Sequence, residues 1–376
     1  MMNLPTPQGT QESRQTFHSF SGQNLLFSGD ITPKKISVIP LTYLTWKHMF
    51  GTLNIRTYVC FFYLNSKGCA VMKGWLGVGT LDDVMNRFPT EESCVPVLFS
   101  FKWPHGFRCP NCRHPHAYVI RTRRLPLYEC GSCRHQTSLT AGTIFEGSRT
   151  SLRKWIAAIW LVANPKEGIN AVRLRSIINV TYKTAWAMLH KIRTAISCAD
   201  EGERLEEHVH GFIAFNGPRL YPSVDLAPRE QPIIVAASLA PNGDGRHYKM
   251  KQVNRQHMSG KLLLPCGCDR FIEEHISAPE SNVSIIRQRF RVKHNSSLYA
   301  VFRRAQRWLC DTFRGIGGKY LQFYLDEFCY RENSTARDTA GWEHLAAICC
   351  ADNGARQRYL WRATSSRNCC RFLAAA

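Results

Sequence analysis

The chain has 376 residues, of which 44% are hydrophobic, a composition that suits a globular protein of roughly two or three domains. Its 49 Lys and Arg residues outnumber 28 Asp and Glu residues, and the net charge of +21 favours a nucleic-acid partner, because basic side chains displace counterions condensed on phosphate. The first residues lack the pattern of a signal peptide, and the longest obvious apolar run, Tyr58 to Leu64, is too short to span a membrane. We therefore exclude a secreted disulfide-rich protein and a membrane protein, and we expect a cytoplasmic, nucleoid-associated chain.

Residues 1–79 show no clear periodicity, and we assign them no function. Thr80 is expected to cap a short helix at the start of a domain predicted over residues 80–142. Within it, two C-x-x-C pairs separated by 17 residues have the spacing of a structural zinc ribbon. Coincidental pairing in a cysteine-rich chain is disfavoured, because turn-forming residues lie within both pairs. The predicted zinc ligands are Cys109, Cys112, Cys130 and Cys133.

Between the two pairs, residues 117–120 and 125–128 are predicted to form strands around a basic turn. Arg121, Arg123 and Arg124 of this turn could be merely solvated, but three arginines on an exposed turn can also bind phosphate. The surrounding residues 101–195 include 16 Lys and Arg residues against three acids, so we predict that the turn contacts DNA.

Three helices are predicted in a small domain over residues 143–199. Ser151 can cap the first, the second covers residues 169–178, and Thr181 caps a longer third. The last two resemble a helix-turn-helix, although any three-helix bundle contains such a pair.

The third of these helices has an apolar stripe, and several basic residues lie at its other positions. Among them, Lys183, Lys191 and Arg193 are predicted to contact DNA.

The hydrophobic period changes after an acid-rich linker, and residues 205–333 are predicted to form a separate domain. Its order of three strands, a helix, a strand and two helices is that of an RNase H-like fold, although the pattern alone supports only a mixed α/β domain. Residues 334–376 are predicted to be an irregular tail. The expected elements cover residues 208–216, 232–239, 247–253, 271–276, 282–286, 298–313 and 320–330.

Several stretches carry a resemblance to a known family. They are FPTEESC at 88–94, KWPHGFRCPNC at 102–112, TAGTIF at 140–145, KW at 154–155, YKTAW at 182–186 and LHKIR at 189–193. Together they closely resemble the N-terminal half of bacterial insertion-sequence transposases that carry a zinc ribbon before an ISXO-like DDE domain. The resemblance is specific across about residues 80–197 and weaker in residues 302–306 and 320–332.

The resemblance implies that the protein cuts and joins double-stranded DNA at the ends of an insertion element. The sequence leaves open whether the chain works alone or as a homo-oligomer. In that chemistry an RNase H-like domain holds two Mg²⁺ ions with acidic or amide side chains. One metal activates the attacking water or 3′-hydroxyl, and the other stabilises the leaving oxygen. The expected overall architecture is therefore α/β and multidomain, with a zinc ribbon, a helix-turn-helix-like helical domain and an RNase H-like domain.

The acids that this chemistry needs are missing from their expected positions, so the RNase H-like domain is predicted to be degenerate. The first acid should follow a Val-His pair on the first strand, but Val209-His210 is followed by residues 211–216 without a carboxylate. The second should fall near residues 276–281, where Pro279 stands at the likely position. The third should precede Phe302-Arg303-Arg304, where Ser296 or Ser297 is the nearest match.

We assign no catalytic residue, and Mg²⁺ is expected only if catalysis survives. Asp225, Glu280 and Glu327 are possible substitutes, but we prefer to interpret them as a loop acid, a helix-end or loop acid, and a surface acid. Three functions remain in competition: a transposase-derived DNA-binding protein without strand transfer, an active DDE transposase with misaligned acids, and a nonenzymatic zinc-dependent DNA-binding regulator.

Overall fold

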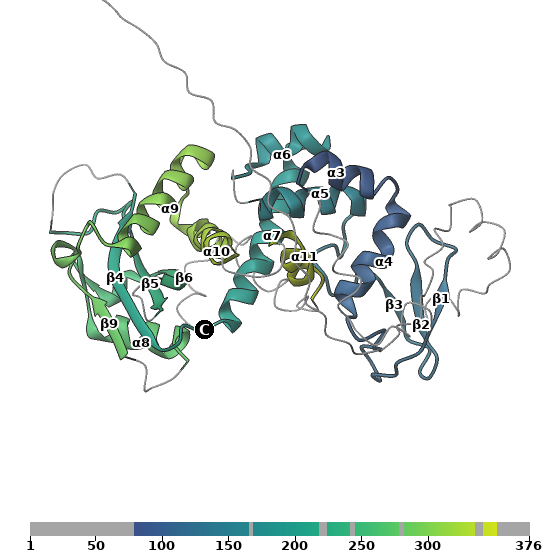
Figure 1. Ribbon diagram of the computed structural model, residues 1–376, viewed down its shortest axis with the longest axis horizontal. Coiled ribbons are helices and arrows are strands. Elements are labelled where there is room, and N and C mark those ends of the chain that lie inside the picture. The colour runs from purple at the N-terminus through teal and green to yellow at the C-terminus, as the bar shows by residue number, and fades with distance from the viewer. Residues whose placement is uncertain are drawn as a thin grey trace, which may run out of the picture. The chain divides into compact units, whose positions relative to one another are not determined.

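The computed structural model describes residues 79–164, 168–217, 224–240, 245–277, 282–334 and 341–351 (Figure 1). All of them lie within one compact unit that covers residues 73–376. The predicted extension at residues 1–79, apart from Gly79, and the predicted tail beyond residue 351 lie outside the described residues.

Two threonine-capped helices precede the cysteine pairs. The predicted helix after Thr80 is confirmed as α3 (Leu81–Arg87), where the Thr80 hydroxyl accepts the Asp83 N–H and the Asp83 carboxylate accepts the Thr80 N–H. Thr90 caps α4 (Glu91–Lys102) in a similar way through the N–H of Ser93. The next three strands, β1 (Ala117–Ile120), β2 (Leu127–Cys130) and β3 (Gln136–Ser138), form an antiparallel sheet in that order.

The three predicted helices are present as α5 (Leu152–Ala163), α6 (Ala171–Ile178) and α7 (Tyr182–Gly202). Asn179 ends α6 in the left-handed conformation, with φ 50°, and the Thr181 hydroxyl accepts the Thr184 N–H at the start of α7. Helices α6 and α7 pack directly on each other. The tight turn therefore places the N-terminus of α7 beside the C-terminus of α6.

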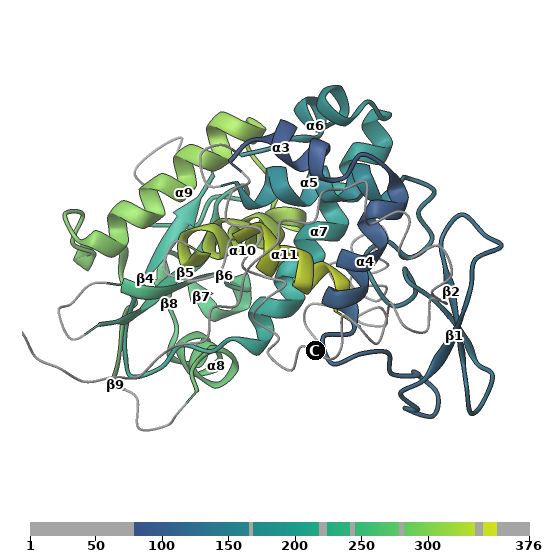
Figure 2. The same cartoon turned by 45° about the vertical axis from the view of Figure 1, so that its right-hand side comes forward.

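The prediction of an irregular tail is wrong for residues 341–350, which form helix α11 (Gly341–Cys350). Trp342, Leu345 and Cys349 are buried along one face, at the i, i+3, i+7 spacing of an amphipathic helix. Helix α11 packs against α4, α5 and α7, so the ribbon, the helical segment and this C-terminal helix share one hydrophobic core (Figure 2).

The remaining elements confirm a mixed α/β arrangement. A four-stranded sheet has the order β6-β5-β4-β9, in which β4 pairs with β9 in parallel and the other pairs are antiparallel. Its strands are β4 (His208–Asn216), β5 (Gln231–Leu239), β6 (Gly245–Gln252) and β9 (Asn282–Ile286).

Helices cover both faces of this sheet. Phe212 and Val235 pack with α9 (Ser297–Phe313) and α10 (Gly318–Ser334), whereas Ile213 and Ile234 pack on the side of α8 (Pro265–His275). The short hairpin of β7 (Met258–Ser259) and β8 (Leu262–Leu263) lies before α8. Helix α8 begins six residues earlier than predicted, because Pro265 at the first turn fits a helix start.

Helix α10 connects the sheet to the helical core, since it packs on both α7 and β6 (Figure 1). None of the described helices combines the length and apolar character needed to cross a bilayer.

Candidate metal centre and nucleic-acid interface

The four predicted ligands come together. Every pair of sulfur atoms among Cys109, Cys112, Cys130 and Cys133 lies within 4.8 Å. The Cys109 and Cys133 Sγ atoms are 3.6 Å apart, and those of Cys112 and Cys130 are 3.5 Å apart. A tetrahedral zinc with bonds of about 2.3 Å needs sulfur–sulfur separations of roughly 3.8 Å. The four thiols therefore lie close enough together to hold one metal ion, as a zinc ribbon requires.

Both cysteine pairs adopt the same turn. The N–H of Arg113 donates to the Cys109 carbonyl at 2.8 Å, and the N–H of Arg134 donates to the Cys130 carbonyl at 3.1 Å. Arg113 and Arg134 both have positive φ, 61° and 56°, a conformation uncommon for residues other than glycine. Each turn closes back on its first cysteine and directs two sulfur atoms towards the shared centre.

The pKa values of the Cys133 and Cys112 thiols are shifted in opposite directions. The backbone N–H of His135 is the main cause that lowers the pKa of Cys133 to about 6. The backbone N–H of His114 favours the Cys112 thiolate, but contacts with the neighbouring sulfurs and burial outweigh it and raise the pKa of Cys112 to about 12. Four thiolates without a cation repel one another, so a divalent metal supplies the charge that lets all of them ionise.

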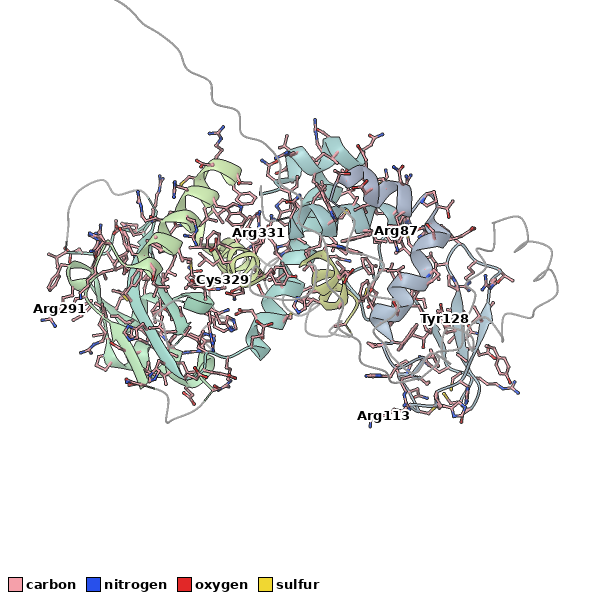
Figure 3. All side chains as sticks on the ribbon, in the orientation of Figure 1. Arg87, Arg113, Tyr128, Arg291, Cys329 and Arg331 are labelled. Atoms are coloured by element: carbon pink, nitrogen blue, oxygen red, sulfur yellow. The ribbon has the colours of Figure 1, made fainter. Side chains whose placement is uncertain are left out.

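The metal centre rests on an aromatic cluster that joins it to α4. Trp103 and Phe107 pack around Tyr128 of β2, with ring centroids 5.2 and 6.0 Å from the Tyr128 ring. Figure 3 labels Tyr128 in the ribbon. The Lys102 ammonium donates to three backbone carbonyls just after the second cysteine pair, those of Ser138, Leu139 and Ala141. The ribbon is therefore packed into the larger core, which limits how far it can move.

The arginines of the β1–β2 turn are exposed, as a phosphate-binding role requires. Arg121 and Arg123 extend from the turn, whereas Arg124 forms an ion pair with Glu91 of α4 at 2.5 Å. Glu91 also accepts the N–H of Leu152 at the start of α5, at 2.8 Å. Arg124 therefore also has a structural role, because it fixes the turn to the helical core.

Of the predicted basic residues on α7, Lys183 is exposed in the first turn. An open cleft of about 400 Å³ lies next to it, between the starts of α5 and α7, and includes Arg149, Lys154 and Thr181 in its lining. Sequence reasoning missed Arg149 and Lys154 as part of this face. Their positions on either side of the predicted helix cap Ser151 could have indicated that they lie near the start of this helix.

The structure corrects the prediction that Lys191 and Arg193 face DNA. Arg193 is 3% exposed, and its Nε donates to a carboxylate oxygen of Glu327 at 2.5 Å. The Lys191 ammonium donates to the carbonyls of Ile144 and Glu146, at 3.0 and 2.8 Å. Helix α10 and the segment before α5 cover these positions. Helical periodicity alone does not show whether such positions face solvent or another element.

His190 on the same helix is also buried, against the rings of Trp186, Tyr320 and Phe323. Burial, with smaller contributions from Arg193 and Lys319, lowers the pKa of His190 to about 4. The imidazole is therefore neutral at pH 7 and acts as a core side chain.

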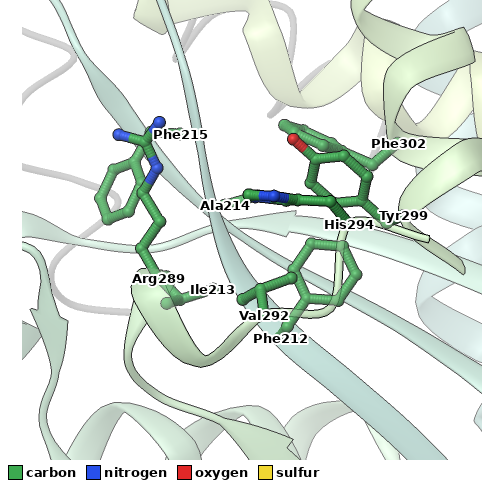
Figure 4. A pocket seen from close by; sticks show the side chains of 9 residues that line it. All are labelled: Phe212, Ile213, Ala214, Phe215, Arg289, Val292, His294, Tyr299 and Phe302. Atoms are coloured by element: carbon green, nitrogen blue, oxygen red, sulfur yellow. The ribbon is translucent and has the colours of Figure 1, made fainter. Parts of the chain in front are cut away.

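A small pocket includes residues from two of the stretches in which catalytic acids were expected from the sequence, residues 211–216 and the residues just before Phe302. It lies beside β4 and the start of α9, and includes Phe212, Phe215, Arg289, His294 and Tyr299 in its lining (Figure 4). None of the described residues that line it is acidic. Its volume of about 10 Å³ is enough for roughly one water molecule.

Of the possible substitute acids, neither Asp225 nor Glu327 lines this pocket. Asp225 is exposed in a loop, as preferred from the sequence, and Glu280 lies outside the described residues. The interpretation of Glu327 as a surface residue is wrong, since this carboxylate is fully buried against Arg193.

A second buried charge cluster lies between α7, β6 and α10. Asp200 contacts the ammonium groups of Lys249 and Lys251 at 2.7 and 2.6 Å, and Lys251 also contacts Asp326 at 2.8 Å. Burial acts to raise the pKa of Asp200, but the two lysines outweigh it and lower this pKa. The ion pairs of Asp200 and Asp326 therefore hold α7 and α10 against β6.

Comparison with known proteins finds similarity over part of the chain. A family described as the transposase zinc-ribbon domain matches residues 89–136. A 113-residue stretch is 28% identical to a protein of Halobacterium salinarum named "Uncharacterized protein in transposable element ISH50". That match covers 30% of this chain and 38% of the relative. No solved structure matches the chain. Both matches agree with the resemblance drawn from the sequence: residues 89–136 are similar to transposase zinc-ribbon domains, and part of the chain is similar to a protein of a transposable element.

Proposed function

We propose that this transposase-like chain binds double-stranded DNA at insertion-sequence ends through its zinc ribbon and the α6–α7 pair, without cutting or joining strands. The observation that carries the proposal is the set of four thiols at zinc-ligand spacing, within a segment similar to transposase zinc-ribbon domains. The basic turn at Arg121 and Arg123 belongs to the same ribbon, and Lys183 begins the second helix of the pair. Phosphate neutralisation by these side chains would give most of the affinity.

The α/β part supports an RNase H-like interpretation. Three antiparallel strands, β4 to β6, are followed by α8 and by β9, which pairs in parallel with the first strand of the sheet. This connectivity agrees with the element order expected from the sequence. The interpretation gives a reason for the pocket beside β4, which lies where the first and third metal-binding acids are expected.

Loss of strand transfer follows from the chemistry of that pocket. Two-metal catalysis needs carboxylate or amide oxygens that converge on the ions. The pocket instead includes the rings of Phe212 and Tyr299 and the guanidinium of Arg289. A guanidinium repels Mg²⁺, the Phe212 ring offers it no oxygen, and the neutral hydroxyl of Tyr299 is a weaker ligand for it than a carboxylate. A nonenzymatic regulator would have the same pocket, and the presence or absence of terminal inverted repeats around the gene separates these two functions.

The binding part of the proposal is tested by fluorescence anisotropy with an element-end duplex, using the zinc-loaded full chain. We expect binding that weakens steeply with salt and is lost after zinc chelation. Restored binding after zinc is added back controls for irreversible damage. Binding that is indifferent to both salt and chelation would contradict the proposal.

The catalytic part is tested by incubation of the same duplex with Mg²⁺ or Mn²⁺ and the search for 3′-end cleavage. We expect none at protein concentrations that saturate the duplex. Cleavage that disappears in Asp225→Asn or Glu280→Gln would show that acids outside the pocket serve as ligands and would overturn this part alone.

A further inference from the structure

A basic segment with an exposed aromatic ring follows strand β9. Residues 287–294 read RQRFRVKH, with three arginines and one lysine. Phe290 is 80% exposed, which is unusual for a phenyl ring in a folded unit. Arg287, Arg291 and Lys293 are exposed around it, and Figure 3 shows Arg291 at the outer edge of this region. Neither the zinc ribbon nor the α6–α7 pair accounts for this segment.

The segment is held in place rather than loosely attached. Arg289–Arg291 form a short 3-10 turn in which the N–H of Val292 donates to the Arg289 carbonyl at 3.1 Å. Val292 is buried in the core beneath α9, and the N–H of Leu263 donates to the Arg287 carbonyl at 3.1 Å. With both ends anchored, the turn presents Phe290 to solvent in a defined position. Little conformational entropy would be lost when a ligand packs on the ring.

The charges around the ring select the kind of ligand. Among residues 282–310 there is no acid, so nothing along this stretch neutralises its basic side chains. The Arg291 guanidinium lies 6.0 Å from the Phe290 ring centroid, a distance at which it adds positive charge beside the ring. Arg289, on the inner side of the turn, lines the acid-free pocket beside β4. Phosphates and a flat aromatic group would both find partners here.

We infer that Phe290 is a stacking platform for an unpaired DNA base, and that Arg287, Arg291 and Lys293 bind the phosphates on either side of that nucleotide. Basic grooves that contain aromatic rings are the usual arrangement for single strands, because every base offers a ring face for stacking. A base inside a duplex is already stacked on both sides and cannot take this place. The ligand is therefore a frayed or single-stranded end of the DNA, and the inference rests on the proposed DNA-binding function.

The test compares three DNA ligands by fluorescence anisotropy with the full zinc-loaded chain: a blunt duplex, the same duplex with a 3′ thymidine tail, and the same duplex with an abasic tail of equal length. We expect the thymidine tail to raise affinity more than the abasic tail. Phe290→Ala should lower affinity for the thymidine-tailed DNA about tenfold and leave the other two ligands unchanged. Phe290→Trp should restore binding, and Val224→Ala, a change at another exposed apolar residue, should have no effect.

Other outcomes would overturn the inference. If Phe290→Ala weakens the thymidine-tailed and abasic-tailed ligands equally, the ring does not stack on a base. If Phe290→Leu binds as well as Phe290→Trp, the contact is apolar only. A chain that binds the blunt duplex but gains nothing from the thymidine tail disproves the stacking site alone. Failure to bind the blunt duplex, with a tail-dependent gain retained, disproves the duplex-binding function alone.

Discussion

The zinc ribbon and the α/β sheet use their reactive side chains in opposite ways. The ribbon directs four thiols to one point and contains the groups that a metal requires. In the sheet region, by contrast, Asp200, Asp326 and Glu327 are paired with lysine or arginine, and the pocket beside β4 is lined by rings and basic groups. The two regions therefore differ in chemistry: the ribbon has a set of thiols that can hold a metal ion, whereas the sheet region uses its buried acids in ion pairs.

The largest effect should come from loss of the ribbon's metal. Cys130→Ser should release the zinc and destabilise the ribbon, because structural zinc contributes about 10 kcal/mol or more of folding free energy in small zinc domains. Metal analysis should give one zinc per chain for the wild type, and limited proteolysis should show cleavage within residues 100–142 of the variant. Cys310→Ser, at an exposed cysteine of α9, is the matched control. Stoichiometric zinc in Cys130→Ser would contradict the assignment.

The next largest effect should come from the buried ion pair between Arg193 and Glu327. Glu327→Gln leaves the buried Arg193 guanidinium without its anion, and such losses cost about 3–5 kcal/mol of folding free energy. Urea denaturation measures this loss, and the double variant Arg193→Met/Glu327→Leu should recover much of it. A Glu327→Gln chain with unchanged stability but altered strand cleavage would instead identify a catalytic carboxylate.

A pH dependence of stability should arise from His190, the buried histidine of α7. The pKa of His190 is lowered from its ordinary 6.5 to about 4 in the folded chain. The unfolded state therefore binds more protons between these values, and stability falls as the pH is lowered from about 6.5 to 4. His190 should account for about 2–3 kcal/mol of that loss, by the worth of one pKa unit. His190→Phe should make the stability profile less steep in this window, although a slope remains because burial also lowers the pKa of His275, to about 3.

The smallest effect should appear at the basic turn of the ribbon. Arg121→Ala and Arg123→Ala should hardly change stability, since both side chains are exposed. Each should make the plot of log affinity against log salt shallower by about one. Arg307→Ala, an exposed arginine on α9, is the control. Equal effects of all three changes would show that general charge, not the turn, governs binding.

The sequence could predict the features that depend on neighbouring residues. The C-x-x-C spacing and its turn residues were enough to identify the ribbon, and the threonine caps located α3 and α7. The strand pattern predicted the mixed α/β class. It could not show how distant segments cover one another: Glu327, which buries Arg193, lies 134 residues further along the chain.

Helix α11 is a different case, because its signal was present in the sequence. Trp342, Leu345, Ala346 and Cys349 repeat with a helical period, but the helix is short and its surroundings give little pattern. Its stability comes from packing on α4, α5 and α7, which only the folded chain reveals.

The return of α11 to the first half of the chain has a consequence for shortened products of the gene. The N–H of Ile144 donates to the Cys349 carbonyl at 3.2 Å, and Leu345 and Cys349 fill the core beside α5. A polypeptide terminated after the third helix of the helical segment would lack these side chains and expose the apolar surface they cover. Early termination would therefore yield a protein prone to degradation rather than a compact, stable fragment.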